Sequence, residues 1–298
     1  MESGNLTDVV QSDFGLTINR SHKIEGGTVN EAYVVETSKG DAIVRIAKER
    51  NSFPFEIWAY TRFKAIGIPC PEVIAYQERP SGIGFPTMIL EKISGNPLKD
   101  VELSPEKEDL SYEEMGAILR KIHSITVEGY GYFQFNEGVA RGKDSSWGQY
   151  LESSGARGNL HHLLENGFIS PSEFEILLGN YEALVVLPVS KPVFVYNDFH
   201  SVHVFTDGDE ITGIIDPGNA IAGDPRYDIA MSLYFQNDRQ QESFKNGYGV
   251  LANDPEVDKY LLFIAAQKVA LRHKAGRDNV AKGADRLKEL LSPGRLFR

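Results

Sequence analysis

The chain has 298 residues, of which 41% are hydrophobic and 24% are charged, and its formal net charge is −11. This is the composition of a soluble globular protein with room for two domains. The acidic balance disfavours a nucleic-acid partner, which usually requires a basic patch. The single cysteine, Cys70, excludes an internal disulfide and a cysteine-based zinc site. No apolar run approaches the roughly 18–20 residues of a membrane span, and the polar, acidic start at Met1 is unlike a secretion signal. We therefore expect a cytoplasmic protein with no membrane partner.

The first third of the chain is predicted to be a β-rich lobe with one helix. Short runs of β-branched and apolar residues alternate with turn residues, and one stretch carries apolar residues at helical spacing. The predicted elements are strands at 33–37, 42–47, 73–77 and 86–92 and a helix at 53–66. Gly67 and Pro69 are expected to end that helix.

The pattern changes after residues 94–97, and helical periodicity dominates most of the rest of the chain. Amphipathic helices are predicted at 109–123, 257–271 and 282–291. We therefore expect an α+β fold with a small β-rich N-terminal nucleotide-binding lobe, residues 1–94, and a larger, mainly helical lobe, residues 95–298. The larger lobe would carry catalysis and substrate binding.

Two aspartates, Asp198 and Asp216, each follow a strand-like run, and a third run lies between them at 202–206. Strands that end on carboxylates and are joined by a hairpin would place the two acids side by side. This suits phosphoryl transfer, in which one acid accepts the proton of a hydroxyl and the other holds the metal on the nucleotide phosphates. Either aspartate alone would more often be a surface acid in a β-turn. The spacing and the flanking strands together favour the catalytic interpretation.

The segment 197–203, Asn-Asp-Phe-His-Ser-Val-His, with Ile-Ile-Asp at 214–216, resembles the catalytic segment of the aminoglycoside phosphotransferase family of antibiotic kinases. The run Gly-Asp-Pro-Arg-Tyr-Asp at 223–228 matches a further feature of that family. The resemblance extends over roughly residues 20–270 and is strongest in the catalytic segment. It implies a protein-kinase-like, two-lobed fold and a nucleotide-dependent phosphotransferase with an alcohol group as acceptor.

The resemblance implies a role for each matching position. Asp198 corresponds to the catalytic base, Asp216 to the metal-binding acid and Asp228 to the acid that braces the catalytic loop. Arg45 stands where kinases carry a strand lysine that pairs with the phosphates, and Glu56 stands where its ion-pair partner lies. Strand alternation by itself would instead place Arg45 on the outer face as a solvated charge.

Further nucleotide contacts are implied in the N-terminal lobe. Gly26, Gly27 and Thr28 resemble the loop that covers the phosphates, where glycine lets the backbone approach closely, although any hairpin could carry such residues. Glu91 and Ile93 lie in a segment that resembles the hinge whose backbone groups hold adenine. The implied co-substrate is ATP or GTP, with Mg²⁺ or Mn²⁺ as the metal.

Three positions depart from the family pattern, because Tyr196, Asn197 and His203 stand where His, Gly and Asn are usual. Asn tolerates positive φ, so the turn at Asn197 can persist. His203 has four interpretations: a metal ligand through nitrogen, a partner of a metal-bound water or phosphate, a structural strand residue, or the mark of a site with reduced activity. Mg²⁺ prefers oxygen ligands, whereas imidazole suits softer metals. The macrolide-kinase branch of the family is similar to this chain in carrying His here.

The acceptor is less constrained by the sequence. Asp238, Glu242 and Asp254 are candidate acids for a cationic substrate. The leading hypothesis is transfer of the γ-phosphoryl group to a hydroxyl of an aminoglycoside-type antibiotic, which would give resistance by inactivation. The acidic charge supports a cationic partner, although acidity also serves solubility. The alternatives are a macrolide or endogenous-metabolite kinase of the same fold and a non-catalytic nucleotide-binding protein. The oligomeric state is left open.

Overall fold

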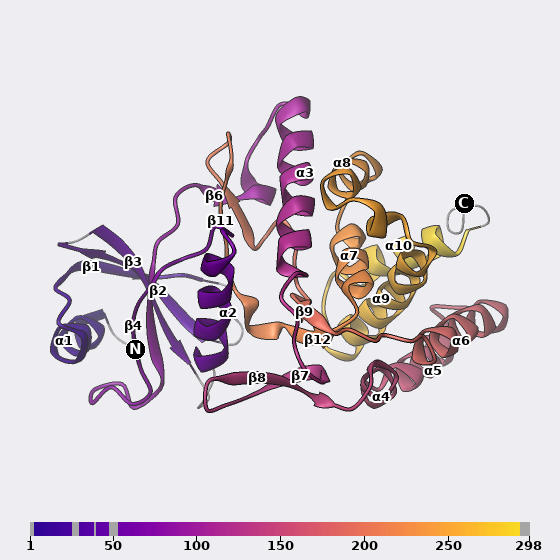
Figure 1. Ribbon diagram of the computed structural model, residues 1–298, viewed down its shortest axis with the longest axis horizontal. Helices are drawn as coiled ribbons and strands as arrows, with labels where there is room; N and C mark the ends of the chain where they lie inside the picture. The colour runs from indigo at the N-terminus through magenta and orange to yellow at the C-terminus, as the bar shows by residue number, and fades with distance from the viewer. Residues whose placement is uncertain (1–2, 26–29, 39, 48–52, 293–298) are drawn as a thin grey trace. The chain divides into compact units, whose positions relative to one another are not determined.

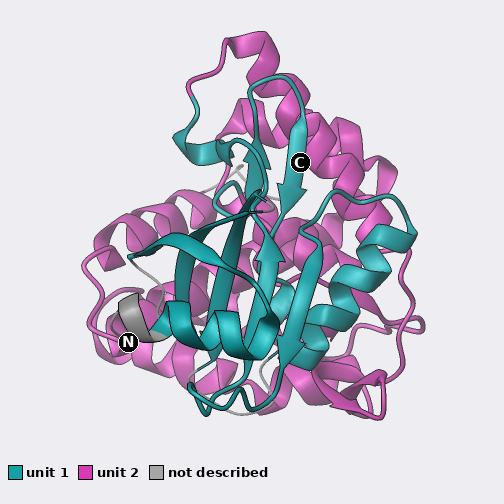
Figure 2. Ribbon diagram, turned by 90° about the vertical axis from the view of Figure 1, so that its left-hand side faces the viewer, with its two compact units in different colours: residues 1–101, 201–218 teal, residues 102–200, 219–298 magenta. Residues whose placement is uncertain are grey.

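The computed structural model describes residues 3–25, 30–38, 40–47 and 53–292 (Figure 1). Packing within the chain separates it into two compact units (Figure 2). Unit 1 consists of residues 1–101 and 201–218, and unit 2 consists of residues 102–200 and 219–298. The expected α+β class is confirmed, because unit 1 is rich in strands and unit 2 is mainly helical.

Unit 1 is built on a five-stranded antiparallel sheet with the strand order β1-β2-β3-β5-β4. The elements are α1 (Ser3–Phe14), β1 (Ile18–Lys23), β2 (Asn30–Thr37), β3 (Gly40–Ala47), α2 (Phe53–Ala65), β4 (Val73–Gln77) and β5 (Thr87–Glu91). Alternation along β3 buries Val44 and Ile46 in a core that includes Leu6 of α1. Arg45 lies between these two residues and so points to the opposite face of the sheet, where it meets α2.

A second, three-stranded sheet of unit 1 carries the predicted hairpin. It contains β6 (Asn96–Pro97), β10 (Val204–Thr206) and β11 (Ile211–Ile214) in the order β11-β10-β6, and the short helix η1 (Leu98–Asp100) follows β6. The N–H of Ile214 donates to the carbonyl of Pro69 at 3.0 Å, and the hydroxyl of Thr212 donates to the carbonyl of Ser94 at 2.6 Å. Gly95 has a φ of +82°, and a Cβ there would lie 2.1 Å from the Thr206 carbonyl oxygen. These contacts explain why residues 201–218 pack with unit 1, although the sequence prediction assigned all of 95–298 to one lobe.

Unit 2 combines a four-stranded sheet, in the order β8-β7-β12-β9, with eight α-helices among the described residues. The helices are α3 (Pro105–Ile122), α4 (Trp147–Ser153), α5 (Ala156–Glu165), α6 (Pro171–Val185), α7 (Pro225–Tyr234), α8 (Asp238–Tyr248), α9 (Pro255–Lys274) and α10 (Val280–Leu291), of which α4 is the shortest. The strands are β7 (Tyr130–Asn136), β8 (Val139–Asp144), β9 (Val193–Val195) and β12 (Ile221–Gly223), and the 3₁₀ turns are η2 (Pro217–Asn219), at the border of the units, and η3 (Val250–Asn253).

Helix α9 forms the centre of unit 2. Its middle is apolar on all sides, from Leu261 to Ala266, and these residues are buried. A helix that is apolar all round belongs inside a core. Helices α5, α6, α7 and α10 pack against it (Figure 1). Helix α7 is therefore held against the buried middle helix of the unit.

Predicted and observed elements agree best where the periodicity is long. The helix predicted at 53–66 is α2 and the strand predicted at 73–77 is β4. The helix predicted from residue 109 begins at Pro105, because the hydroxyl of Ser104 accepts a hydrogen bond from the N–H of Lys107 and proline suits a first turn. No periodic signal predicted α1, α4, α5 or α6. No helix in the described part of the chain is both long and apolar enough to span a membrane.

Candidate active site

An ion pair between β3 and α2 forms the centre of the candidate site in unit 1. The Nη1 atom of Arg45 lies 2.5 Å from Oε2 of Glu56, and the side chains are 14% and 4% exposed. The guanidinium also lies over the ring of Phe53, 5.4 Å from its centroid. Burial raises the pKa of Glu56 above its usual value, although Arg45 opposes that rise. Arg45 is thus a buried, oriented cation and not the solvated strand charge that alternation alone allowed.

Asp216 joins this pair from the end of β11. Its Oδ1 atom lies 3.2 Å from Nη2 of Arg45, and its backbone N–H donates to the hydroxyl of Tyr60 at 3.1 Å. Asp216 has a φ of +68°, an uncommon value for a residue with a side chain. A Cβ at Gly218 would lie 2.8 Å from Oε1 of Glu56, so the chain passes closely over the ion pair. Strand β3, helix α2 and the end of β11 therefore converge on one cluster of charges.

The residues of this cluster fit a divalent cation at Asp216. The Asp216 side chain is 43% exposed, and a carboxylate with one oxygen on Arg45 keeps further acceptor capacity. His203 directly precedes β10, the other strand of the hairpin, and its carbonyl accepts a hydrogen bond from the N–H of Ile215 at 3.0 Å. This contact brings the backbones of His203 and Asp216 to the same end of the hairpin. The four interpretations of the His203 side chain stay open.

In unit 2, the loop after β9 is held by one buried carboxylate. Asp228 of α7 is 0% exposed and accepts hydrogen bonds from the N–H of Tyr196 at 2.5 Å and of Asn197 at 2.9 Å. Its Oδ2 also lies 3.0 Å from Nε2 of His123, whose Nδ1 is 2.7 Å from the hydroxyl of Tyr248. Asn197 has a φ of +67°. The carboxylate therefore fixes a left-handed turn immediately before Asp198.

Asp198 is presented by this braced loop and is only partly buried. Its side chain is 28% exposed, and its Oδ1 atom lies 3.2 Å from Nε2 of His200. The carbonyl of Phe199 accepts a hydrogen bond from the hydroxyl of Ser232, and the ring of His200 lies 4.4 Å from that of Phe235. The loop thus rests on the last turn of α7. Asp198 belongs to unit 2 and Asp216 to unit 1, so their expected convergence stays a prediction.

Comparison with known proteins assigns the chain to a family. A model described as the phosphotransferase enzyme family, APH, matches residues 22–261. The chain belongs to this family. Hygromycin-B 4-O-kinase of Escherichia coli is 23% identical over 260 residues, which cover 83% of this chain and 73% of that protein. The chain is therefore a phosphotransferase.

Solved structures of low sequence identity share the fold of this phosphotransferase. A thermostable mutant of aminoglycoside phosphotransferase APH(4)-Ia, in a ternary complex with ADP and hygromycin B, has a TM-score of 0.75 at 19% identity, covering 97% and 99% of the two chains. A GDP complex of aminoglycoside 2'-phosphotransferase IIIa has a TM-score of 0.70 at 16% identity, covering 97% of each chain. The prediction of a protein-kinase-like fold is confirmed.

The remaining predicted nucleotide contacts of the phosphotransferase are only partly described. Gly26, Gly27 and Thr28 lie outside the described residues. Glu91 is the last residue of β5, and Ile93 follows two residues later. The side chain of Ile93 fills the space over Gly213, where a Cβ would lie 2.5 Å from its Cδ1. The Ile93 side chain is therefore used in packing, which leaves only backbone groups for a hinge contact.

A cavity of about 500 Å³ lies in unit 2 among α7, α8, η3, α9 and α10. The three acids that the sequence suggested for a cationic substrate, Asp238, Glu242 and Asp254, all line it. Asp258 is a fourth carboxylate in the lining, and Lys245 and Arg286 also line it. The lining carries more acids than bases, so the cavity favours a cationic occupant.

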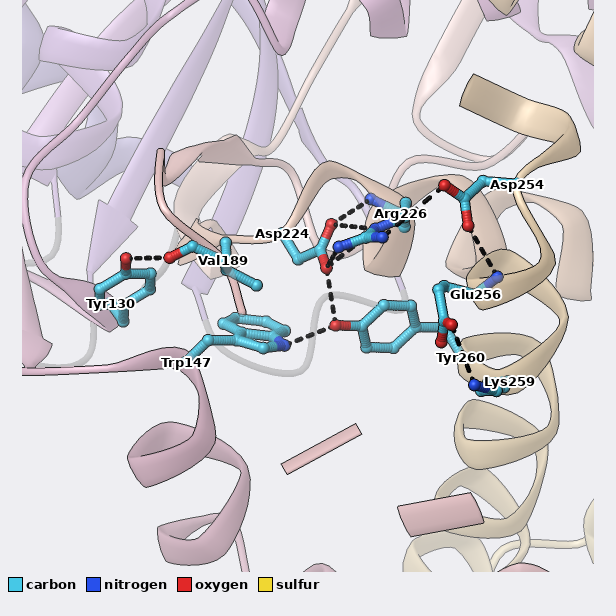
Figure 3. A network of polar contacts seen from close by, with 9 residues as sticks. All are labelled: Tyr130, Trp147, Val189, Asp224, Arg226, Asp254, Glu256, Lys259 and Tyr260. Carbon is cyan, nitrogen blue, oxygen red and sulfur yellow. Dashed lines mark hydrogen bonds and ion pairs between the residues drawn. The ribbon is translucent and has the colours of Figure 1, made fainter. Parts of the chain in front are cut away.

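A polar network holds Asp254 in place (Figure 3). The Nη2 atom of Arg226 lies 2.8 Å from Oδ2 of Asp224, and its Nη1 atom lies 3.7 Å from Oδ2 of Asp254. The hydroxyl of Tyr260 donates to Asp224 at 2.9 Å and accepts a hydrogen bond from Nε1 of Trp147 at 2.7 Å. The Gly-Asp-Pro-Arg run signals Asp224 and Arg226 in the sequence. No sequence spacing identifies Trp147 and Tyr260 as their partners.

Proposed function

We propose that this phosphotransferase moves the γ-phosphoryl group of ATP or GTP to a hydroxyl of a small cationic acceptor, with an aminoglycoside-type antibiotic as the leading candidate. The observation that carries the proposal is the partly exposed carboxylate of Asp198 on a loop that Asp228 braces. A base for phosphoryl transfer must be held rigidly and still be reachable by the acceptor. Membership of the phosphotransferase family supports the same chemistry.

In the proposed reaction, Asp198 accepts the proton of the acceptor hydroxyl. The acceptor oxygen forms a bond to the γ-phosphorus, while the bond from that phosphorus to the bridging oxygen breaks and the nucleoside diphosphate leaves. Asp198 then releases its proton to water. Its contribution is orientation of the hydroxyl and removal of the proton as the new bond forms.

The cluster in unit 1 would bind the nucleotide. Arg45 would hold phosphate oxygens, and Glu56 would fix the orientation of its guanidinium. Asp216, with or without His203, would hold Mg²⁺ or Mn²⁺, which when bound neutralises charge on the phosphates. The backbones of Glu91 and Ile93 would meet the purine, and Gly26, Gly27 and Thr28 would cover the phosphates. ADP and GDP in complexes of similar proteins support a nucleotide co-substrate.

The cavity in unit 2 would receive the amino groups of the acceptor. Leu233, in the last turn of α7, lines that cavity, and the Asp198 loop rests on the same turn through Ser232 and Phe235. An acceptor that spans this turn would place amines against carboxylates and a hydroxyl at Asp198. Hygromycin B, the ligand of a similar structure, supports an acceptor of this class.

The test is the isosteric substitution Asp198→Asn together with Asp198→Ala. We expect phosphorylation to fall by a factor of about 10²–10⁴, because the base is lost, while nucleotide affinity stays within about twofold. Product formation is measured by mass spectrometry and nucleotide affinity by calorimetry. Asp209→Asn, which removes an exposed carboxylate at the tip of the hairpin, is the matched control. Retained turnover in both Asp198 variants would exclude Asp198 as the base.

A substrate panel separates the proposed function from its alternatives. Aminoglycosides, macrolides and small alcohols are each tested with ATP and GTP, in Mg²⁺ and in Mn²⁺. Turnover of macrolides or small alcohols alone would replace the aminoglycoside hypothesis with the second kinase function. Nucleotide binding without transfer to any acceptor in either metal would favour a non-catalytic binding protein.

A further inference from the structure

Lys268 of α9 is a half-buried lysine whose ammonium has no hydrogen-bond or ion-pair partner among the described residues. Two other lysines of α9 do have partners. Lys259 pairs with Glu256 at 2.9 Å, and Lys274 donates to the side chain of Asn159 at 2.6 Å. The Nζ atom of Lys268 instead lies over an aromatic ring, 4.8 Å from the centroid of Phe235.

The ring of Phe235 connects Lys268 to the proposed base. Phe235 contacts the ring of His200 at 4.4 Å, and Nε2 of His200 lies 3.2 Å from Oδ1 of Asp198. Burial lowers the pKa of Lys268, and the nearby negative charge of Asp198 opposes that effect. The ammonium therefore lies within the electrostatic reach of Asp198 without forming an ion pair with it.

Partial burial of an ammonium group costs free energy unless a hydrogen-bond acceptor or a negative charge contacts it. Loss of hydration costs the charged form free energy, and a single cation–π contact returns only about 0.5–2 kcal/mol. Arg272, one turn further along α9, adds a like charge and already donates to the hydroxyl of Tyr234 at 3.1 Å. The missing partner of Lys268 is then best supplied by a ligand oxygen beside Asp198.

We propose that Lys268 is an acceptor-binding residue, whose ammonium donates a hydrogen bond to an acceptor oxygen next to the hydroxyl held by Asp198. This inference rests on the proposed function, because it requires an acceptor at Asp198. It also defines the acceptor further. The group beside the reacting hydroxyl is an oxygen, since an amine would meet a like charge, and the amines belong at the carboxylates of the cavity.

The test compares Lys268→Met, which keeps the chain length and the contact with Phe235, with Lys268→Arg, which keeps the charge. The acceptor is the one that the wild type phosphorylates best in the substrate panel. Lys268→Met is expected to raise the KM of that acceptor by about tenfold to a hundredfold, because a charge-assisted hydrogen bond is lost. The KM of ATP stays within about twofold, and Lys268→Arg recovers most of the loss. Lys282→Met removes the same charge from an exposed site of α10 and is expected to change nothing.

A second readout uses two acceptors that differ only in a hydroxyl or an amine beside the reacting hydroxyl. The wild type is expected to prefer the hydroxyl compound, and Lys268→Glu is expected to prefer the amine. An unchanged acceptor KM and unchanged preference in a folded Lys268→Met protein would overturn the inference. A fall in kcat with unchanged acceptor KM would overturn it too. If the wild type turns over the acceptor and Asp198→Asn does not, the proposed function stands whether or not Lys268 binds the acceptor. An inactive wild type would overturn both the proposed function and the role of Lys268.

Discussion

At the scale of single residues, the candidate site depends on backbone conformations that most side chains avoid. Asn197 and Asp216 both have positive φ, and each lies shortly after a strand. Asn197 directly precedes the proposed base Asp198, and Asp216 is itself the proposed metal ligand. Asn197 stands where the related pattern has glycine, and it reaches the left-handed region at low cost. Its side chain also donates to the carbonyl of Asn219 at 2.9 Å. The departure from the family pattern therefore preserves the turn.

The conformation of Asn197 predicts that two small substitutions destabilise the protein to different extents. Asn197→Gly and Asn197→Ala lose the same side-chain hydrogen bond, so the difference between them reports the cost of positive φ. We expect the alanine variant to unfold with a free energy about 1 kcal/mol lower than the glycine variant. We also expect its kcat to be about tenfold lower, because Asp198 moves with the turn. Urea unfolding and steady-state kinetics measure the two effects. Equal stability in both variants would contradict the assigned strain.

At the scale of elements, the candidate nucleotide site forms where a strand and a helix each contribute one side chain of an ion pair. Alternation along β3 places Arg45 on the face opposite to the α1 core, and α2 brings Glu56 to that face. Both side chains are buried, so each charge depends on the other. In unit 2, Asp228 of α7 similarly links two other segments, because its carboxylate contacts His123 at the end of α3 and accepts a hydrogen bond from the loop after β9.

This dependence predicts a large effect for Glu56→Gln, because the substitution removes the more buried of the two carboxylates that pair with Arg45. The free energy of unfolding is expected to fall by about 3 kcal/mol. Glu36→Gln is the matched control in the same unit, because Glu36 pairs with Arg20 at 4.0 Å and the side chains are 46% and 76% exposed. The control is expected to change the free energy by less than about 1 kcal/mol. Similar losses in both variants, measured by urea unfolding, would argue against a special role of the buried pair.

At the scale of the whole molecule, the chain passes between two units more than once. Residues 201–218 leave unit 2 directly after the Asp198 loop and add the β10–β11 hairpin to unit 1. The proposed base and the proposed metal ligand are thus parts of one continuous segment but belong to different packing units. A ligand of the hairpin cluster should therefore affect the stability of the folded chain as a whole.

Linkage predicts that nucleotide binding raises thermal stability in a metal-dependent manner. A nucleotide at a hundred times its Kd adds about 2.7 kcal/mol to the free energy of unfolding. We expect ATP with Mg²⁺ or Mn²⁺ to raise the Tm, and we expect EDTA or Asp216→Asn to remove most of the increase. Asp209→Asn, in the same hairpin, should keep it. Thermal shift measurements test this, and an increase that survives Asp216→Asn would show that the metal is held elsewhere.

The amino-acid sequence by itself determined the fold class and the hairpin, and it is the source of the proposed site residues. Long periodicities predicted α2 and β4, and the strand–acid–hairpin pattern singled out Asp198 and Asp216. These features are local, because propensity, alternation and turn chemistry act over a few residues. The same reasoning could not choose between a buried and a solvated Arg45.

Only the tertiary structure decided which side chains meet. It buried Arg45 against Glu56, gathered Asp238, Glu242 and Asp254 around one cavity and placed the ammonium of Lys268 near Asp198. It also joined residues 201–218 to unit 1 through pairing of β10 with β6. Such contacts link residues far apart in the chain, and they depend on how whole elements pack, which no local pattern in the sequence encodes.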